Sequence, residues 1–114
     1  MFQTISFTLL TRIILGWNSR IEIVARGDGN GEKLKNLEIR AGSHPVPSGN
    51  VELLEHNGRV AFWRGPGKTG KTYKIDFICP KIVEYITMQI IDNSEGNNGL
   101  HINEVTVFGY NVDG

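Results

Sequence analysis

The sequence has almost no cysteine. Cys79 stands alone among 114 residues, so the chain cannot form an internal disulfide, and it has no CxxC pair for zinc or redox chemistry. Cys79 lies inside the apolar run of KIDFICP, which favours a buried, inert thiol over a reactive or intermolecular one. Cysteine usage alone therefore weakly favours an intracellular protein.

Net charge is also absent. Twelve basic and twelve acidic residues cancel. This balance argues against the basic footprint of a nucleic-acid-binding domain and against the polybasic patch of a membrane-surface protein. We expect no nucleic-acid partner, and any attraction to a charged ligand has to be local.

Long apolar runs are missing as well. The N-terminus, MFQTISFTLLTRIILGW, has no basic residue before its apolar run, contains Arg12 and is too short to span a bilayer. We expect no transmembrane insertion. We interpret residues 1–17 as an atypical N-terminal segment, either a strand or a poorly fitted end, and a degenerate signal peptide is the weaker alternative.

Glycine and short apolar stretches, in contrast, are abundant. Fourteen glycines and four prolines punctuate the apolar runs, and this pattern favours an all-β sandwich or barrel over a helical or α/β domain. The length supports one domain with a single core. We expect about seven or eight strands and no helix, arranged as a two-sheet β-sandwich.

Alternating apolar residues place the strands, which we predict at 21–25, 37–41, 51–55, 59–64, 71–79, 83–91 and 100–110. The first two flank a long polar loop, RGDGNGEKLKN. Asn57-Gly58 predicts a tight hairpin turn between 51–55 and 59–64. Strand 83–91 is apolar on both faces, as in the centre of a sheet, and strand 100–110 alternates imperfectly, which indicates a bulge.

One motif suggests nucleotide binding. Gly65–Thr72, GPGKTGKT, satisfies the phosphate-loop pattern GxxxxGK[ST] at every required position. A phosphate loop needs a helix after it, whose N-terminal N–H groups converge on the phosphate. YKIDFICP follows instead, with the period-two alternation of a strand. We therefore interpret the match as coincidental and keep nucleotide hydrolysis as a weak alternative.

Other motifs give no catalytic site. Residues 26–28 spell RGD, an adhesion tripeptide that often occurs by chance. His44, His56 and His101 lack the spacing that would place two imidazoles on one metal, so surface histidines are the expected interpretation. There is no GxSxG nucleophile elbow, and the sequence identifies no general base that would activate the lone cysteine. We expect a protein that is not an enzyme.

The polar loop carries the candidate site, which consists of Arg26, Asp28 and Lys33. Sugar hydroxyls are neutral and closely spaced, and two cationic donors with one carboxylate can bind adjacent hydroxyls through charge-assisted hydrogen bonds. The planar guanidinium of Arg26 would set the direction of the hydrogen bonds to the sugar, and Lys33 would add a more adaptable donor. Asp28 would hold the two cationic side chains in place. On these three residues alone, a solvated charged loop is the stronger interpretation.

The sequence resembles the fucolectin family, the eel-type fucose-binding lectins within the galactose-binding-like sandwiches that include the discoidin (F5/8 type C) domains. RxDxxxxK is matched by Arg26, Asp28 and Lys33, the following LKNLEIRAG looks like the family's L-x-x-x-E-I-R-x-G segment, and INEVTVFGY is similar to its closing L-C-E-V-E-V-Y-G. The resemblance covers about residues 20 to 110 and implies a galactose-binding-like jelly roll as one domain over residues 18–114, incomplete at its N-terminus.

The resemblance also implies function. Arg26 and Lys33 would donate to hydroxyls and ring oxygen of a fucose-type sugar, with Asp28 ordering the loop, and a calcium ion would bind the side chain of Glu104 and the backbone carbonyl of Asn103. The expected protein is a secreted, extracellular, non-enzymatic lectin for fucosylated glycans or glycoproteins, and an oligomer is compatible with it.

The chain departs from the family pattern in several places. No histidine precedes His44, although the family has one before the arginine, and the family's N-terminal calcium loop is missing or replaced. Gly29 and Asn30 stand where the best-known members have adjacent cysteines, and Cys79 lacks its partner. The alternative hypothesis is a discoidin-like scaffold that binds a protein or membrane surface and has lost sugar binding.

Overall fold

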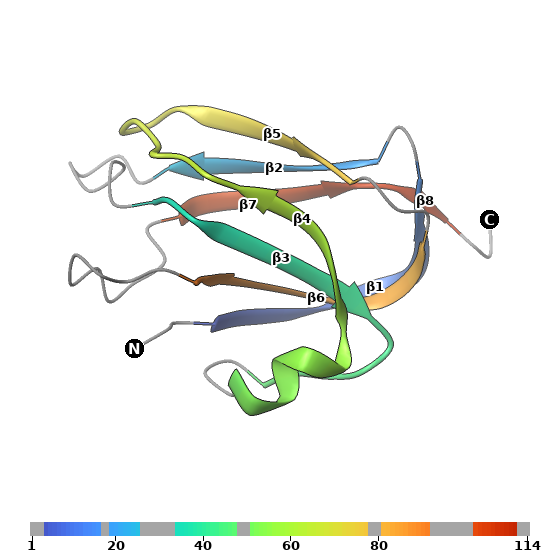
Figure 1. The fold of residues 1–114 in the computed structure, drawn as a ribbon. Coiled ribbons are helices and arrows are strands. Elements are labelled where there is room, and N and C mark those ends of the chain that lie inside the picture. The colour runs from blue at the N-terminus through green and yellow to red at the C-terminus, as the bar shows by residue number, and fades with distance from the viewer. Residues whose placement is uncertain are drawn as a thin grey trace.

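The computed structural model describes residues 4–16, 19–25, 34–47, 51–77, 81–91 and 102–111. They form two antiparallel sheets that face each other (Figure 1). The five-stranded sheet has the order β4 (Gly58–Trp63), β3 (Leu37–Gly42), β6 (Lys81–Ile90), β1 (Thr4–Leu15) and β8 (Tyr110–Asn111). The three-stranded sheet has the order β5 (Thr72–Asp76), β2 (Arg20–Ala25) and β7 (Ile102–Phe108). The predicted all-β sandwich is therefore confirmed.

The core lies between the two sheets, as the alternation in the sequence predicts. In β2, Ile21, Ile23 and Ala25 are buried, and the residues between them are only partly buried. The inward side chains of β3 meet them from the other sheet, and the buried set comprises Leu15, Ile21, Ile23, Ala25, Leu34, Leu37, Ile39, Ala41, Val60, Ala61, Ile75, Phe77, Val83, Ile86, Met88 and Ile90. Such burial contributes roughly 1.5–3 kcal/mol for each large aliphatic side chain, so these residues dominate the stability of the sandwich.

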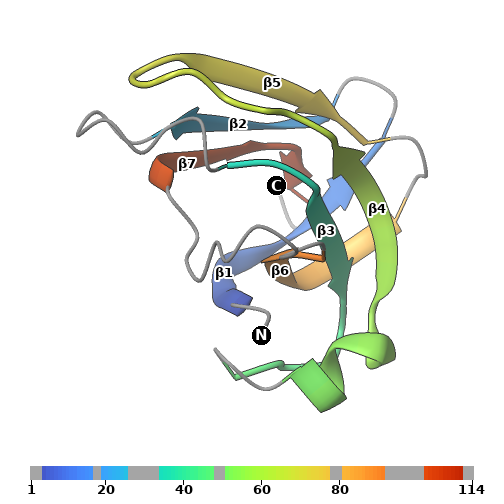
Figure 2. The same cartoon turned by 60° about the vertical axis from the view of Figure 1, so that its left-hand side comes forward.

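Strand β6 is central, as its two apolar faces predict. It pairs with β1 on one side and with β3 on the other, and its last five residues are all buried. Figure 2 shows β6 and β1 in the layer opposite β2, β5 and β7. Ile86, Met88 and Ile90 belong to the core. Thr87 and Gln89 alternate with them and are also buried, but this second face is polar, with hydrogen bonds to Arg40 and Glu38 of β3.

The N-terminal segment forms a long strand within the five-stranded sheet. Strand β1 pairs with β6 from Thr4 to Leu15, with an irregularity between Thr8 and Ile13, and Ile13 and Ile14 also pair with β8. The expectation of a strand over part of residues 1–17 is thus met. Where the domain begins stays a prediction. Within the described ranges, no helix is long and apolar enough to cross a membrane.

The predicted strand at 51–55 is wrong. Val51–His56 forms a 3₁₀ helix, η2, and the predicted hairpin turn at Asn57-Gly58 is replaced by the junction between η2 and β4. Glu52, Leu53, Leu54 and Glu55 are good helix formers, and the apolar alternation here was too short to decide. Asn57 is 1% exposed, so its amide is part of the interior rather than an exposed turn.

Strands β2 and β3 lie in different sheets. The sequence placed them on either side of one polar loop at the rim of a sheet, and the structure shows that residues 26–36 connect the three-stranded sheet to the five-stranded sheet. The loop therefore starts and ends at the same rim of the sandwich but on opposite layers. This crossing explains why an eleven-residue segment separates two strands that a two-residue turn would otherwise join.

Candidate functional site

The predicted sugar-binding residues, Arg26, Asp28 and Lys33, lie outside the described residues, and their roles stay predictions. The described structure does show where their loop is attached. Ala25 ends β2 and Leu34 follows the loop, and both side chains are fully buried. A loop whose two ends are fixed in a core is carried by a rigid scaffold, which is how binding loops are commonly placed.

A second loop, residues 64–71, joins β4 to β5 and holds both ends of the 26–33 loop. Ala25 N–H donates to the carbonyl of Lys71 at 2.9 Å, and Gly70 N–H donates to the carbonyl of Ala25 at 3.2 Å. Gly67 N–H donates to the carbonyl of Leu34 at 2.9 Å. These three backbone hydrogen bonds tie the predicted sugar loop and the 64–71 loop into one rim.

Gly65 permits this close approach. Its φ is +71°, and a Cβ placed there would lie 2.7 Å from the carbonyl oxygen of Leu34 and 2.9 Å from Cα of Lys35. Both the backbone conformation and the contact favour glycine at this position. The following Gly65–Pro66 peptide bond is cis. The Lys68 N–H donates to the hydroxyl of Tyr73 at 2.7 Å, and this hydrogen bond ties the loop to β5.

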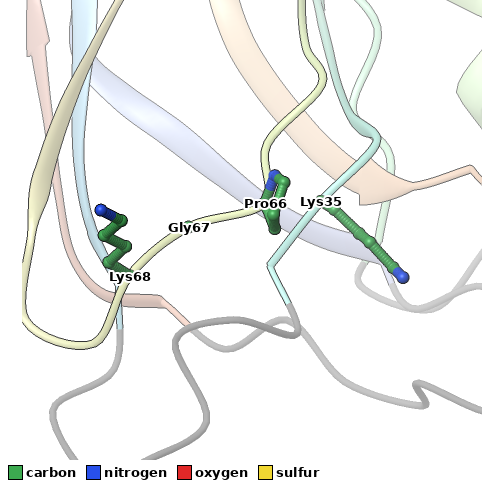
Figure 3. Close-up of a pocket in the computed structure, with 4 residues that line it drawn as sticks. All are labelled: Lys35, Pro66, Gly67 and Lys68. Atoms are coloured by element: carbon green, nitrogen blue, oxygen red, sulfur yellow. The ribbon is translucent and has the colours of Figure 1, made fainter.

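A hollow opens at this rim, with a volume of about 420 Å³ and a lining of Lys35, Pro66, Gly67 and Lys68. In Figure 3 the two lysine side chains extend on opposite sides of the Pro66-Gly67 backbone. Pro66 and Gly67 thus give the hollow an uncharged part of its lining, and the ammonium groups of the lysines, which point away from each other at its two ends, are of a kind that donates hydrogen bonds to a polyol or an anion. The sequence did not assign these lysines to the site. The glycine-rich loop between two strands was the feature of the sequence that could have drawn attention to this rim.

The phosphate-loop interpretation does not fit this geometry. Strand β5 begins at Thr72, the last residue of GPGKTGKT, and runs to Asp76, so no helix N-terminus follows the loop to supply converging N–H groups. The prediction of a strand at this point is confirmed over these five residues. Beyond Phe77, the predicted strand at 71–79, including Cys79, lies outside the described residues.

The predicted calcium ligands lie at the same rim, at the start of β7. Strand β2 pairs Val24 with Glu104 and Ala25 with Ile102, so Asn103 is one extra residue on β7 and forms a β-bulge. The bulge predicted for the last strand is confirmed, and a bulge releases backbone groups from the ladder and redirects them. The side chain of Glu104 is exposed.

These two positions fit calcium only in part. Calcium takes about six to eight oxygen ligands, whereas one carbonyl and one carboxylate supply two of them. The described residues contain no group of three or more His, Cys, Asp or Glu side chains that could hold a metal. They do not complete a calcium site, so we base no step of ligand binding on the ion.

A buried carboxylate network was not predicted. Glu38 and Arg40 alternate with the core residues of β3 and so lie on the outer face of the five-stranded sheet, yet Glu38 is only 2% exposed. Arg40 Nε donates to Glu38 Oε1 at 2.8 Å, and Arg59 Nε donates to Oε2 at 2.6 Å. Gln89 Nε2 donates to Oε1 at 3.2 Å. The Glu-x-Arg spacing in LEIRAG, which puts both side chains on one face, was the available signal.

The charge state of Glu38 follows from these contacts. Burial by itself raises the pKa of Glu38, but the hydrogen bonds and positive charges of Arg40 and Arg59 outweigh it and lower the pKa below its ordinary value of 4.5. Glu38 is therefore ionised at neutral pH and holds β3, β4 and β6 together on their outer face. We assign this network to the scaffold, because both guanidinium groups are already bound to the same carboxylate.

The architecture defines a class: a two-sheet β-sandwich of the galactose-binding-like kind, in which the 64–71 loop and the ends of the 26–33 loop meet at one rim. Comparison with known proteins agrees. No protein-family model matches the chain, and no curated protein matches it. Among solved structures, the chain is similar to the crystal structure of an F-lectin (fucolectin) from the serum of the striped bass, Morone saxatilis, with a TM-score of 0.67 and 25% identity over 93% of this chain. The chain has a fucolectin-like fold, and it spans 32% of the length of that lectin chain.

Proposed function

We propose that this chain is a non-enzymatic lectin module that binds a fucose-type sugar at the rim loop 26–33. The observation that carries the proposal is the similarity to the striped bass fucolectin over 93% of the chain. In this proposal Arg26 and Lys33 donate hydrogen bonds to the sugar, and the carboxylate of Asp28 orients the two cations.

The described rim supports this function physically. Sugar binding exchanges hydrogen bonds with water for hydrogen bonds with protein, so net affinity depends on donors that are already ordered. The hydrogen bonds from the 64–71 loop to Ala25 and Leu34 fix both ends of the sugar loop and so reduce the cost of ordering it. The adjacent hollow between Lys35 and Lys68 gives room for further residues of a glycan.

The partners and location belong to the proposal as well. We propose fucosylated glycans or glycoproteins as ligands and an extracellular, secreted location, in keeping with the serum source of the similar fucolectin. Calcium at Asn103 and Glu104 stays a prediction, and the remaining oxygen ligands would have to come from outside the described residues.

A glycan array tests the proposal directly. Wild-type protein is expected to bind fucosylated glycans and to lose most of that signal in Arg26→Ala and in Lys33→Ala. Lys74→Ala is the matched control, because Lys74 is an exposed cation in β5, on the strand beyond the loop. Absence of any glycan signal, or equal signals in wild type and the loop variants, would reject the assignment of this loop.

The same experiment separates the alternative, a discoidin-like scaffold that binds a protein or membrane surface. Liposome or protein binding that persists in excess fucose and chelator, together with a blank array, would favour that function. The rim loops would then serve a different ligand on the same sandwich.

A further inference from the structure

Two histidines that are distant in the sequence meet in the structure. His44 follows β3, and His56 is the last residue of η2, twelve positions later. Their ring centroids are 5.4 Å apart, with the ring planes tilted by 40°. Both side chains are exposed, and within the described part of the chain neither imidazole has a hydrogen-bond partner. Both rings are therefore accessible to a ligand from solvent.

A buried amide fixes the two histidines relative to each other. The Asn57 side chain accepts a hydrogen bond from the His44 N–H at 3.2 Å and donates one to the His44 carbonyl at 2.7 Å. Because Asn57 is bonded directly to His56, this pair of hydrogen bonds ties the backbone of one histidine to that of the other. Asn57 is 1% exposed, so water competes little for these bonds.

The surroundings of Asn57 are shaped for this role. A Cβ at Gly42 would overlap the Asn57 amide oxygen, so glycine at this position gives the amide its space. The Asn57 carbonyl also accepts a hydrogen bond from Arg40 Nη1 at 2.8 Å. The junction between η2 and β4 is thus anchored to β3 at several points, and the imidazole pair stands on a rigid base.

The separation of the rings matches one metal geometry. With a metal–nitrogen distance of about 2.0–2.1 Å and about 1.1 Å from ring nitrogen to ring centre, a shared metal lies about 3.2 Å from each centroid. Two such ligands at a tetrahedral angle have centroids about 5.2 Å apart, whereas a right angle in an octahedral site gives about 4.5 Å. The observed 5.4 Å is nearer to the tetrahedral value than to the octahedral one, and a shared ion also requires that one nitrogen of each ring faces it.

We propose that His44 and His56 form a binding site for a divalent transition-metal ion of tetrahedral preference, of which zinc is the type, with water in the remaining positions. Imidazole nitrogen suits zinc and cobalt, whereas calcium requires oxygen ligands, so this site is chemically distinct from the predicted calcium position. The spacing of His44 and His56 in the sequence argued against a shared metal, but the fold brings their rings to within 5.4 Å of each other.

The site is separate from the proposed sugar loop. Leu34, where the sugar loop ends, precedes β3 and His44 follows it, so the six residues of β3 separate these two positions by about 17 Å or more along the strand. Changes at the histidines are therefore expected to leave glycan binding unchanged. Success or failure of the two proposals can be measured independently.

Calorimetric titration of tag-free protein with zinc tests the proposal. We expect one saturable zinc site per chain, with an affinity at least about tenfold lower in His44→Ala and in His56→Ala, because each removes half of the protein ligands. His101→Ala is the matched control and is expected to retain wild-type affinity. Circular dichroism of the metal-free variants checks that each remains folded.

Cobalt provides a second measurement that reports geometry. Tetrahedral Co²⁺ absorbs much more strongly in the visible range than octahedral Co²⁺, and the spectrum is expected to be of the tetrahedral type in wild type and to disappear in both histidine variants. The proposal is overturned if zinc shows no saturable binding, if His44→Ala binds as wild type does, or if bound cobalt is octahedral.

Discussion

Glu38→Gln is the sharpest test of how the scaffold beneath the rim is held together. The substitution keeps the shape of the side chain and removes its charge from a position that is 2% exposed. Arg40, whose side chain is 16% exposed, then keeps only the exposed carboxylate of Glu55, at 3.7 Å, as its acidic partner among the described residues, whereas Arg59, at 48%, can turn toward water. The loss therefore falls mainly on the Arg40 pairing.

The magnitude follows from these contacts. A hydrogen bond to a charged group contributes about 1.5–3 kcal/mol, and removing one partner of a buried pair costs about 3–5 kcal/mol. The glutamine amide recovers part of this, so we expect a loss of about 3 kcal/mol in the free energy of unfolding. For a domain of this size that lowers the midpoint of thermal unfolding by about 12 °C.

The assay is thermal and urea unfolding followed by circular dichroism, with Glu84→Gln as the matched control. Glu84 pairs with Arg12 on the surface, with side chains 41% and 53% exposed, and such pairs contribute about 0–1 kcal/mol. Equal effects of the two substitutions at neutral pH would refute the argument that burial makes the Glu38 network strong.

The pH dependence gives an independent check. Because the folded-state pKa of Glu38 is lowered, its contribution is fully present above the unfolded-state pKa and is lost as pH falls through the folded-state pKa. The difference in stability between wild type and Glu38→Gln is therefore expected to be constant near neutral pH and to shrink on acidification below about 4.5. A difference that grew in acid would contradict the sign of this linkage.

Three further predictions concern Gly65, Asn57 and the predicted calcium ligand Glu104. Gly65→Ala should destabilise the fold by at least about 1 kcal/mol and weaken glycan binding, because its Cβ would press on the Leu34 carbonyl; unchanged unfolding and binding curves would disprove this. Asn57→Ala should cost about 1–3 kcal/mol, since it leaves the His44 N–H and carbonyl without the amide, and should weaken zinc binding; a stable variant with full zinc affinity would contradict it. Calcium should raise the thermal midpoint of wild type and not of Glu104→Gln, and equal shifts in a thermal scan would rule out that carboxylate as a ligand.

The sequence predicted the fold well where alternation was long. Ile21, Ile23 and Ala25 point inward as expected, and β6 lies at the centre of the five-stranded sheet as predicted. The bulge at Asn103 was visible as a break in alternation. In each case burial of one or both faces imposes a period on the sequence, and that period can be recognised without knowing which strands pair.

The failures occurred where local signals were short or where partners are distant in sequence. Val51–His56 is too short for its alternation to exclude a 3₁₀ helix. Asn57-Gly58 follows the end of that helix and does not form a hairpin turn. The meeting of His44 with His56, and of Glu38 with Arg59, depends on the pairing of β3 with β4 and on the turn of the chain between them. Periodicity within one strand carries no information on such pairing.

For the candidate site, the sequence supplied the residues and the structure supplied the rim that holds them. Arg26, Asp28 and Lys33 were chosen from charge and motif, and the described structure adds the 64–71 loop and the hollow between Lys35 and Lys68. The hollow could not be predicted, because it depends on which loops meet at the end of the sandwich.

The most direct test of the proposed function is a nuclear magnetic resonance titration of isotope-labelled protein with fucose. The account predicts saturable shifts of backbone amides in residues 26–33 and of Gly67 and Gly70, whose amides hold the ends of that loop, with no shift at His44 or His56. A spectrum that does not change, or shifts confined to the η2 end of the molecule, would contradict sugar binding at this rim.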